Sequence, residues 1–265
     1  MNEPGPEGPL EAPRADSPYH RLNPLTKAVS ATVTGIAALV LGGVIGPALL
    51  TLVAVIIPAA IAGVLRVLVR TTLLLSLPIG ISAVLVNVFF FPAGRDVLLR
   101  VGPITATGEG LSLALEVLAR ILAISGAITL FYLTTRPSDF VADLEHRGVS
   151  SRLAFVANAS AQTVPQMLER AGSIVAAQRA RGLDTEGSIV RRLRALPPLV
   201  GPVILGTLGE VEERTMALEA RGFSRPGRRT LLRIPADSGV QRLTRWLLVG
   251  GLSVLAASRI LGVPG

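Results

Sequence analysis

The longest stretch without a charged residue runs from Ala28 to Leu65, and it constrains the fold more than any other feature of the sequence. An α-helix rises about 1.5 Å per residue, so about 20 residues cross the roughly 30 Å hydrocarbon core of a bilayer. The stretch is therefore too long for a single crossing, and two helices must share it. The cluster Gly42–Pro47 holds three glycines and a proline, which predicts a tight turn between the two helices.

Three further apolar stretches predict three more crossings, at about residues 71–91, 111–135 and 246–263. The composition of the whole chain agrees, because 50% of the residues are hydrophobic and the mean hydropathy is +0.57, which is too apolar for a water-soluble protein of this size. We therefore predict an all-α, polytopic integral membrane protein with about five transmembrane helices, surrounded by the lipid bilayer.

The basic residues predict how the chain is oriented, because positively charged flanks tend to stay in the cytoplasm. Arg21 and Lys27 precede the first span, Arg66 and Arg70 lie between the second and third, and arginines recur between residues 136 and 233. We expect the N-terminus and the long segment before the last span to be cytoplasmic, and the C-terminus to lie outside. The predicted organisation is a cytoplasmic tail (1–27), four transmembrane helices (28–135), cytoplasmic helices (136–240) and a final transmembrane helix (241–265).

Several classes of chemistry lack the residues that they need. The chain has no cysteine, and its two histidines, His20 and His146, have no histidine or cysteine nearby, so no metal site is predicted. The only lysine, Lys27, follows Leu25 and Thr26 rather than a glycine-rich loop, which excludes a phosphate-binding loop of the usual kind. The net charge of +8 is explained by the cytoplasmic arginines. We therefore predict a non-catalytic protein with no cofactor and no nucleic acid partner.

The predicted cytoplasmic segment contains two helices with the same ending. Apolar residues at helical spacing predict one helix from about Val164 to Gly182 and another from about Ile204 to Gly222, with a break at the prolines between them. The shared endings, 40 residues apart, are Ala180-Arg181-Gly182 and Ala220-Arg221-Gly222, and the prolines are Pro197, Pro198 and Pro202.

Each ending alone is typical of a helix stop, because glycine adopts the left-handed conformation at the position after the last helical residues and arginine suits the helix dipole there. Two matched copies favour a second interpretation, in which each helix presents one guanidinium to a partner. The planar fork of arginine can bind carboxylates and carbonyls in a bidentate way.

With these two endings, the chain resembles the T component of energy-coupling factor (ECF) transporters, the group that includes the CbiQ and BioN type subunits. The mark of that family is a pair of Ala-Arg-Gly motifs at the ends of cytoplasmic coupling helices. Further matches are Leu22–Lys27, Arg136–Asp139 and Gln178–Asp184. One departure is Ala161–Pro165, where the family is expected to carry a more apolar, arginine-containing stretch.

The resemblance implies a multi-pass protein of the prokaryotic cell membrane that couples two other activities. Two cytosolic ABC-type ATPase subunits would bind at the motif residues Ala180, Arg181, Gly182, Ala220, Arg221 and Gly222. A separate small membrane subunit would bind the substrate, a vitamin or a transition-metal ion, and this chain would join it to the ATPases.

Two other classes of protein fit the sequence less well. A stand-alone secondary transporter or channel would place polar groups near the middle of several spans, and these are scarce here. A basic scaffold lying on anionic lipid would not need two matched helix ends. Within the fourth span, Glu116 and Arg120 lie one turn apart, and they form either an intrahelical pair or a polar contact to the substrate-binding partner.

Overall fold

The computed structural model describes residues 17–90, 97–101, 104–183, 189–225 and 236–261. It divides into two compact units. The first, which we call the bundle unit, comprises residues 1–144 and 233–265, and the second, the paired-helix unit, comprises residues 145–232. The prediction of a cytoplasmic tail falls largely on residues 1–16, which lie outside the described residues.

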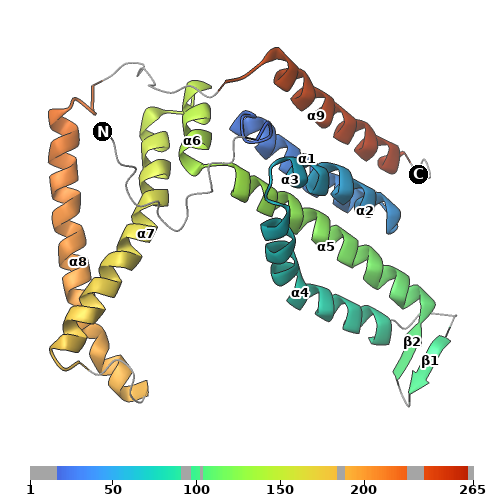
Figure 1. Ribbon diagram of the computed structural model, residues 1–265, viewed down its shortest axis with the longest axis horizontal. Helices are drawn as coiled ribbons and strands as arrows, with labels where there is room; N and C mark the ends of the chain where they lie inside the picture. The colour runs from blue at the N-terminus through green and yellow to red at the C-terminus, as the bar shows by residue number, and fades with distance from the viewer. Residues whose placement is uncertain (1–16, 91–96, 102–103, 184–188, 226–235, 262–265) are drawn as a thin grey trace. The chain divides into compact units, whose positions relative to one another are not determined.

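The bundle unit is built from helices, as Figure 1 shows. They are α1 (Pro24–Val40), α2 (Ile45–Thr51), a π-helical turn (Leu52–Ile56), α3 (Ile57–Ile61), α4 (Leu65–Phe90), α5 (Gly108–Thr134), α6 (Pro137–His146) and α9 (Gly239–Ile260). The predicted turn within Gly42–Pro47 is confirmed, since α1 ends at Val40, α2 begins at Ile45, and Gly43 has a φ of 70°. The π-helical turn ends two residues before Pro58, whose missing N–H interrupts the normal i to i−4 ladder.

Three of the described helices are long and apolar enough to cross a membrane, over Leu65–Asn87, Gly108–Thr134 and Gly239–Ile260. Two shorter apolar helices, Pro24–Val40 and Ile45–Ile61, correspond to the first two predicted spans. Many large apolar side chains on these helices face outward; Leu74 and Trp246, for example, are 64% and 76% exposed. Such a surface suits hydrocarbon, and the prediction of an all-α membrane protein is confirmed.

Two predicted boundaries differ from the structure. The second and third spans meet at Gly63, which has a φ of 73°, so Arg66 and Arg70 lie in the first turns of α4 rather than between two helices. Between α4 and α5, the chain forms an antiparallel hairpin of β1 (Val97–Val101) and β2 (Ile104–Thr107) that was not predicted. Apolar and β-branched residues on either side of a Gly-Pro pair account for it.

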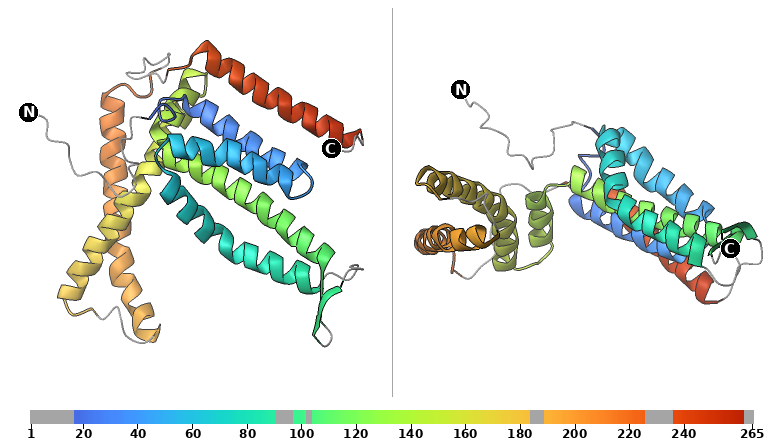
Figure 2. Two further views of the ribbon diagram at one scale, coloured as in Figure 1. Left: turned by 45° about the vertical axis from the view of Figure 1, so that its right-hand side comes forward. Right: turned by 90° about the horizontal axis from the view of Figure 1, so that it is seen from below.

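The core of the bundle unit forms around α5, which lies between α1 and α4 in both Figure 1 and Figure 2. Val55, Leu68 and Leu130 are buried together there, along with small residues that let the helices approach closely. At Gly126, for instance, an added Cβ would lie 3.0 Å from a methyl group of Val55. The final helix, α9, packs against α1.

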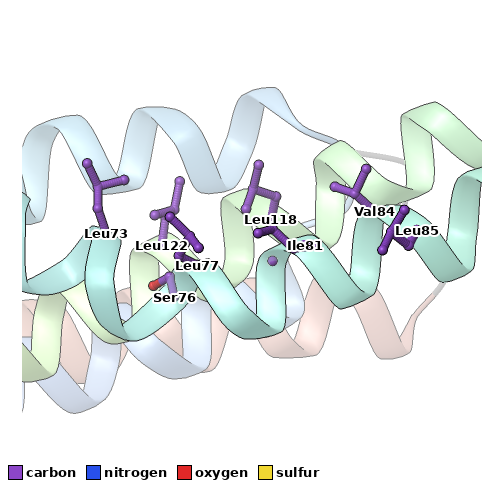
Figure 3. Close-up of a pocket in the computed structure, with 9 residues that line it drawn as sticks. Leu73, Ser76, Leu77, Ile81, Val84, Leu85, Leu118 and Leu122 are labelled. Carbon is purple, nitrogen blue, oxygen red and sulfur yellow. The ribbon is translucent and has the colours of Figure 1, made fainter.

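A groove of about 370 Å³ follows the outer side of the α4–α5 contact (Figure 3). Its lining is apolar except for one hydroxyl, and that group, on Ser76, shares a 2.7 Å hydrogen bond with the hydroxyl of Ser125. The lining residues are Leu73, Ser76, Leu77, Gly80, Ile81, Val84, Leu85, Leu118 and Leu122. The groove thus offers an apolar surface on two of the helices that can cross the membrane.

The paired-helix unit consists of α7 (Ser151–Ala180) and α8 (Ile189–Ala220), which cross along part of their length (Figure 1). Both helices are longer than predicted. The first begins at Ser151, where the hydroxyl of Ser150 accepts the N–H of Leu153 at 3.3 Å, and not near Val164. The prediction of a break at Pro197, Pro198 and Pro202 is wrong, because all three prolines lie inside α8.

Candidate functional site

The first Ala-Arg-Gly motif forms the end of α7 through a specific pattern of backbone hydrogen bonds. Gly182 has a φ of 90°, its N–H donates to the carbonyl of Arg179 at 2.9 Å, and the N–H of Leu183 donates to the carbonyl of Gln178 at 3.0 Å. This is the Schellman arrangement, in which a left-handed residue lets the last carbonyls of a helix find donors. The motif therefore ends α7 in a defined geometry, with Arg181 at the capping position.

The second motif ends α8 with the same hydrogen bonds. Gly222 has a φ of 73°, its N–H donates to the carbonyl of Glu219 at 2.9 Å, and the N–H of Phe223 donates to the carbonyl of Leu218 at 2.9 Å. The prediction that both motifs are glycine-stopped helix ends is confirmed. The two helix ends match closely because each needs a residue in the left-handed conformation, which only glycine adopts without strain.

The two arginines at these ends are available for binding. Arg181 and Arg221 are exposed, and neither side chain has an ion pair or hydrogen bond within the part of the chain that the structure describes. Each follows a helix end held by two backbone hydrogen bonds, which fix the position of its Cα. A partner carboxylate or carbonyl could bind either fork in a bidentate way.

The two motifs lie at opposite ends of the helix pair. The ring of Phe223, directly after the second motif, packs edge-on against Phe155 near the start of α7, with 4.8 Å between ring centroids. The helices are therefore antiparallel. Because Arg181 lies at the far end of α7 from Phe155, helical rise separates the two arginines by about 40 Å.

The end of α7 is also held by α8. The side-chain amide of Gln178 donates to the backbone carbonyl of Pro198 at 3.4 Å. That carbonyl would normally accept the N–H four residues later, but the residue there is Pro202, which has none. Gln178 thus bonds to a carbonyl that proline leaves without a helical donor, and each motif is anchored on the other helix of the pair.

Sequence reasoning did not identify Phe155 or the Pro198 carbonyl as supports of the motifs. The sequence does contain a signal for the Pro198 carbonyl, because Pro198 and Pro202 are four residues apart and the later proline has no N–H to donate to it. The predicted apolar stripes are found on α7 and α8, yet Val164, Ile204 and Leu208 remain 60%, 52% and 56% exposed. These side chains leave apolar surface on the middle parts of α7 and α8.

Glu116 and Arg120 form the expected ion pair one turn apart on α5. They also bond to the turn between α1 and α2. The Oε1 of Glu116 accepts the backbone N–H of Gly43 at 3.1 Å, and Arg120 donates to the carbonyl of Leu41 at 3.2 Å. The pair therefore ties this turn to α5, which explains a charged pair in an apolar helix.

Comparison with known proteins identifies the family. Residues 15–231 match the CbiQ family, described as cobalt transport protein. The chain belongs to this family. Among the relatives of this chain is the energy-coupling factor transporter transmembrane protein EcfT of Heliobacterium modesticaldum, 31% identical over 237 residues, covering 84% of this chain and 86% of the relative. The EcfT of Thermanaerovibrio acidaminovorans is 31% identical over 255 residues, covering 92% and 91%.

A further relative of this chain has a different name. A protein of Bifidobacterium longum that is named as an ABC transporter ATP-binding protein is 30% identical over 233 residues, covering 82% of this chain but only 29% of that protein. Together, the matches and the helices of the bundle unit show that this chain is a transmembrane component of an ECF transporter, a multi-pass protein of the cell membrane.

Proposed function

We propose that this chain couples ATP hydrolysis by two cytosolic ABC-type ATPase subunits to uptake of a vitamin or transition-metal ion by a separate substrate-binding membrane subunit. The observation that supports this most directly is the placement of Arg181 and Arg221, which are exposed at opposite ends of one antiparallel helix pair. Two equivalent ends suit two similar partners. In this proposal each motif docks into one ATPase subunit.

The geometry of the motifs favours tight docking. Because each helix end is already fixed by two backbone hydrogen bonds, little backbone entropy is lost when it binds. The exposed apolar side chains of α7 and α8 add surface that a partner can cover. The relative named as an ATP-binding protein supports the same partner, since a stretch similar to this chain forms part of that longer protein.

In this proposal the chain is non-catalytic, and the hydrolysis takes place in the partner subunits. The absence of a phosphate-binding loop from the sequence supports this assignment. The N-terminus and the paired-helix unit are placed in the cytoplasm, where the ATPases are, and the C-terminus outside. The arginine distribution is the observation that supports this orientation.

The test changes each motif arginine in the full complex, purified from membranes through a tag on this chain. Arg181→Ala and Arg221→Ala should each reduce the amount of ATPase that co-purifies, and the double variant should reduce it at least about tenfold, because a partner carboxylate loses its bidentate donor. Variants with lysine in place of either arginine should retain only part of the binding, since lysine lacks the planar guanidinium that binds a carboxylate in a bidentate way. Uptake of labelled cobalt ion and of a panel of labelled vitamins is measured in the same cells.

Arg225→Ala is the matched control, because Arg225 is exposed and lies one turn beyond the second motif. It should leave both assembly and uptake unchanged. If the double variant Arg181→Ala/Arg221→Ala assembles with the ATPases and supports normal uptake, the two motifs are only helix stops and the proposal is wrong.

A further inference from the structure

The start of α1 is a buried polar junction, which consists of Asn23, Thr26 and Lys27. These residues are only 1%, 6% and 3% exposed, which is unusual for side chains of this kind. The Oδ1 of Asn23 caps α1 by accepting the N–H of Leu25 at 2.9 Å. The amide nitrogen of the side chain and the backbone N–H of Asn23 remain for partners elsewhere in the bundle unit.

The first of these partners lies in α6. The Nδ2 of Asn23 donates to the Oδ1 of Asp143 at 3.0 Å, and Asp143 is 1% exposed. A buried carboxylate that loses such a donor is strongly destabilised, so the bond resists separation of α6 from α1. Asp143 immediately precedes Leu144, the last residue of the bundle unit before the chain enters the paired-helix unit.

The second partner is the segment where the chain returns from the paired-helix unit. The Oε1 of Gln241 accepts the backbone N–H of Asn23 at 2.9 Å, and Arg245 donates to the hydroxyl of Thr26 at 2.8 Å. Arg245 also binds both carboxylate oxygens of Asp237, at 3.0 and 2.8 Å, with both side chains nearly buried. The paired-helix unit ends at residue 232, so Asp237 belongs to the returning connection.

Lys27 joins the junction to the end of α5. Its Nζ donates to the carbonyl of Thr134, the last residue of that helix, at 2.7 Å, and to the carbonyl of His20 at 3.1 Å. One turn of α1 thus contacts the end of α5, helix α6, which leads to the paired-helix unit, and helix α9, which follows that unit.

We propose that this junction transmits movement of the paired-helix unit to the membrane helices, with Asn23 as its central positioning residue. The inference rests on the proposed coupling function. The outgoing connection is bonded to the first turn of α1 through Asp143, and the returning connection is linked to the same turn through Arg245, which binds both Asp237 and Thr26. A force that enters through either connection therefore reaches this turn, directly from α6 and by way of Arg245 from the returning connection. Buried hydrogen bonds transmit that force because breaking them leaves polar groups without partners.

The test exchanges the two polar partners in the intact complex. Asn23→Asp places two carboxylates about 3 Å apart in a buried site, where like charges repel. Asp143→Asn alone keeps an oxygen that can accept from Asn23, and it serves as the single-variant reference for the exchange. In Asn23→Asp/Asp143→Asn the amide donates back to the new carboxylate, and the hydrogen bond forms again with its direction reversed.

The complex with Asn23→Asp should retain its ATPase subunits and hydrolyse ATP, but uptake per ATP hydrolysed should fall at least about fivefold. The double exchange should restore that ratio to within about twofold of the wild type. Rescue of this kind distinguishes a positioning contact from a general loss of structure. A normal ratio in Asn23→Asp, or no rescue in the double exchange, would overturn the inference.

Thr26→Val provides a second variant that is nearly isosteric and removes the hydroxyl that accepts from Arg245 at 2.8 Å and donates weakly to Gln241 at 3.5 Å. It should lower uptake per ATP with no loss of assembly, and an unchanged ratio would also count against the junction. The experiments distinguish this inference from the proposed function. Loss of the motif arginines removes the ATPases from the complex, whereas loss of the junction leaves them bound and active.

Discussion

Arg170 of α7 and Glu210 of α8 form an ion pair, with 2.7 Å between Nη1 and Oε2. Glu210 also accepts a hydrogen bond from Arg214, one turn along α8, at 2.9 Å, and Arg214 donates to Gln166 of α7 at 3.4 Å. These contacts lie between the two Ala-Arg-Gly motifs. They fix the register of the antiparallel helices and so help to set the separation between Arg181 and Arg221.

The ion pair itself should contribute little to stability, because both side chains are about one third or more exposed. A double-mutant cycle with Arg170→Ala and Glu210→Ala, measured by thermal unfolding, should give a coupling energy of about 0.5 kcal/mol that weakens in high salt. A coupling energy near zero at low salt would mean that apolar packing alone sets the register.

The glycines that end α7 and α8 should resist substitution by alanine. Both have positive φ, so Gly182→Ala and Gly222→Ala should each destabilise the local helix end by about 1 kcal/mol and reduce ATPase co-purification. Asparagine tolerates this conformation better, so Gly→Asn should retain most of the binding. Equal binding by the alanine and asparagine variants would show that the geometry of the stop is unimportant.

Gly110, near the start of α5, has no room for a side chain. An added Cβ would lie 2.3 Å from the backbone carbonyl oxygen of Asn87 and 2.9 Å from the hydroxyl of Thr107. Gly110→Ala should therefore lower the free energy of unfolding in detergent by at least about 1 kcal/mol. The control is Gly172→Ala in α7, where nothing lies within 4 Å and alanine should stabilise the helix by about 0.5 kcal/mol. Similar changes in the free energy of unfolding for Gly110→Ala and Gly172→Ala would contradict the predicted clash.

Thiol labelling can test the proposed orientation, because the chain has no native cysteine. In intact cells, Ile45→Cys, at the exposed turn between α1 and α2, should react with a membrane-impermeant reagent. Ser173→Cys, on the exposed side of α7, should react only after permeabilisation. The reverse pattern would place the paired-helix unit outside and exclude docking to cytosolic ATPases.

His20 should make stability depend on pH. Burial and the nearby charge of Lys27 lower the pKa of His20 below its usual value of 6.5. Protonation is then less favourable in the folded chain than in the unfolded one, so this contribution to stability is lost as pH falls below about 6.5. The thermal midpoint should drop more between about pH 7.5 and pH 5.5 in the wild type than in His20→Gln. Parallel pH profiles would rule out this contribution.

Much of the candidate site was predicted from local sequence. Glycine at the end of an amphipathic helix has a restricted set of conformations, so both motif ends could be predicted from Gly182 and Gly222. The supports of these ends could not be predicted in the same way. Gln178 bonds to Pro198, and Phe155 packs on Phe223, through contacts that depend on how two separate helices cross.

The sequence by itself determined that the chain lies in a membrane, because the charge-free stretch Ala28–Leu65 cannot be exposed to water, and it determined where α7 and α8 end. Only the tertiary structure decided that the prolines of α8 stay within a helix and that the two motifs lie at opposite ends of a pair. It alone joined Asn23 to Asp143, 120 positions away. The physical reason is that helix stops and apolar runs follow from neighbouring residues, whereas a buried polar group selects its partner only after distant helices have packed together.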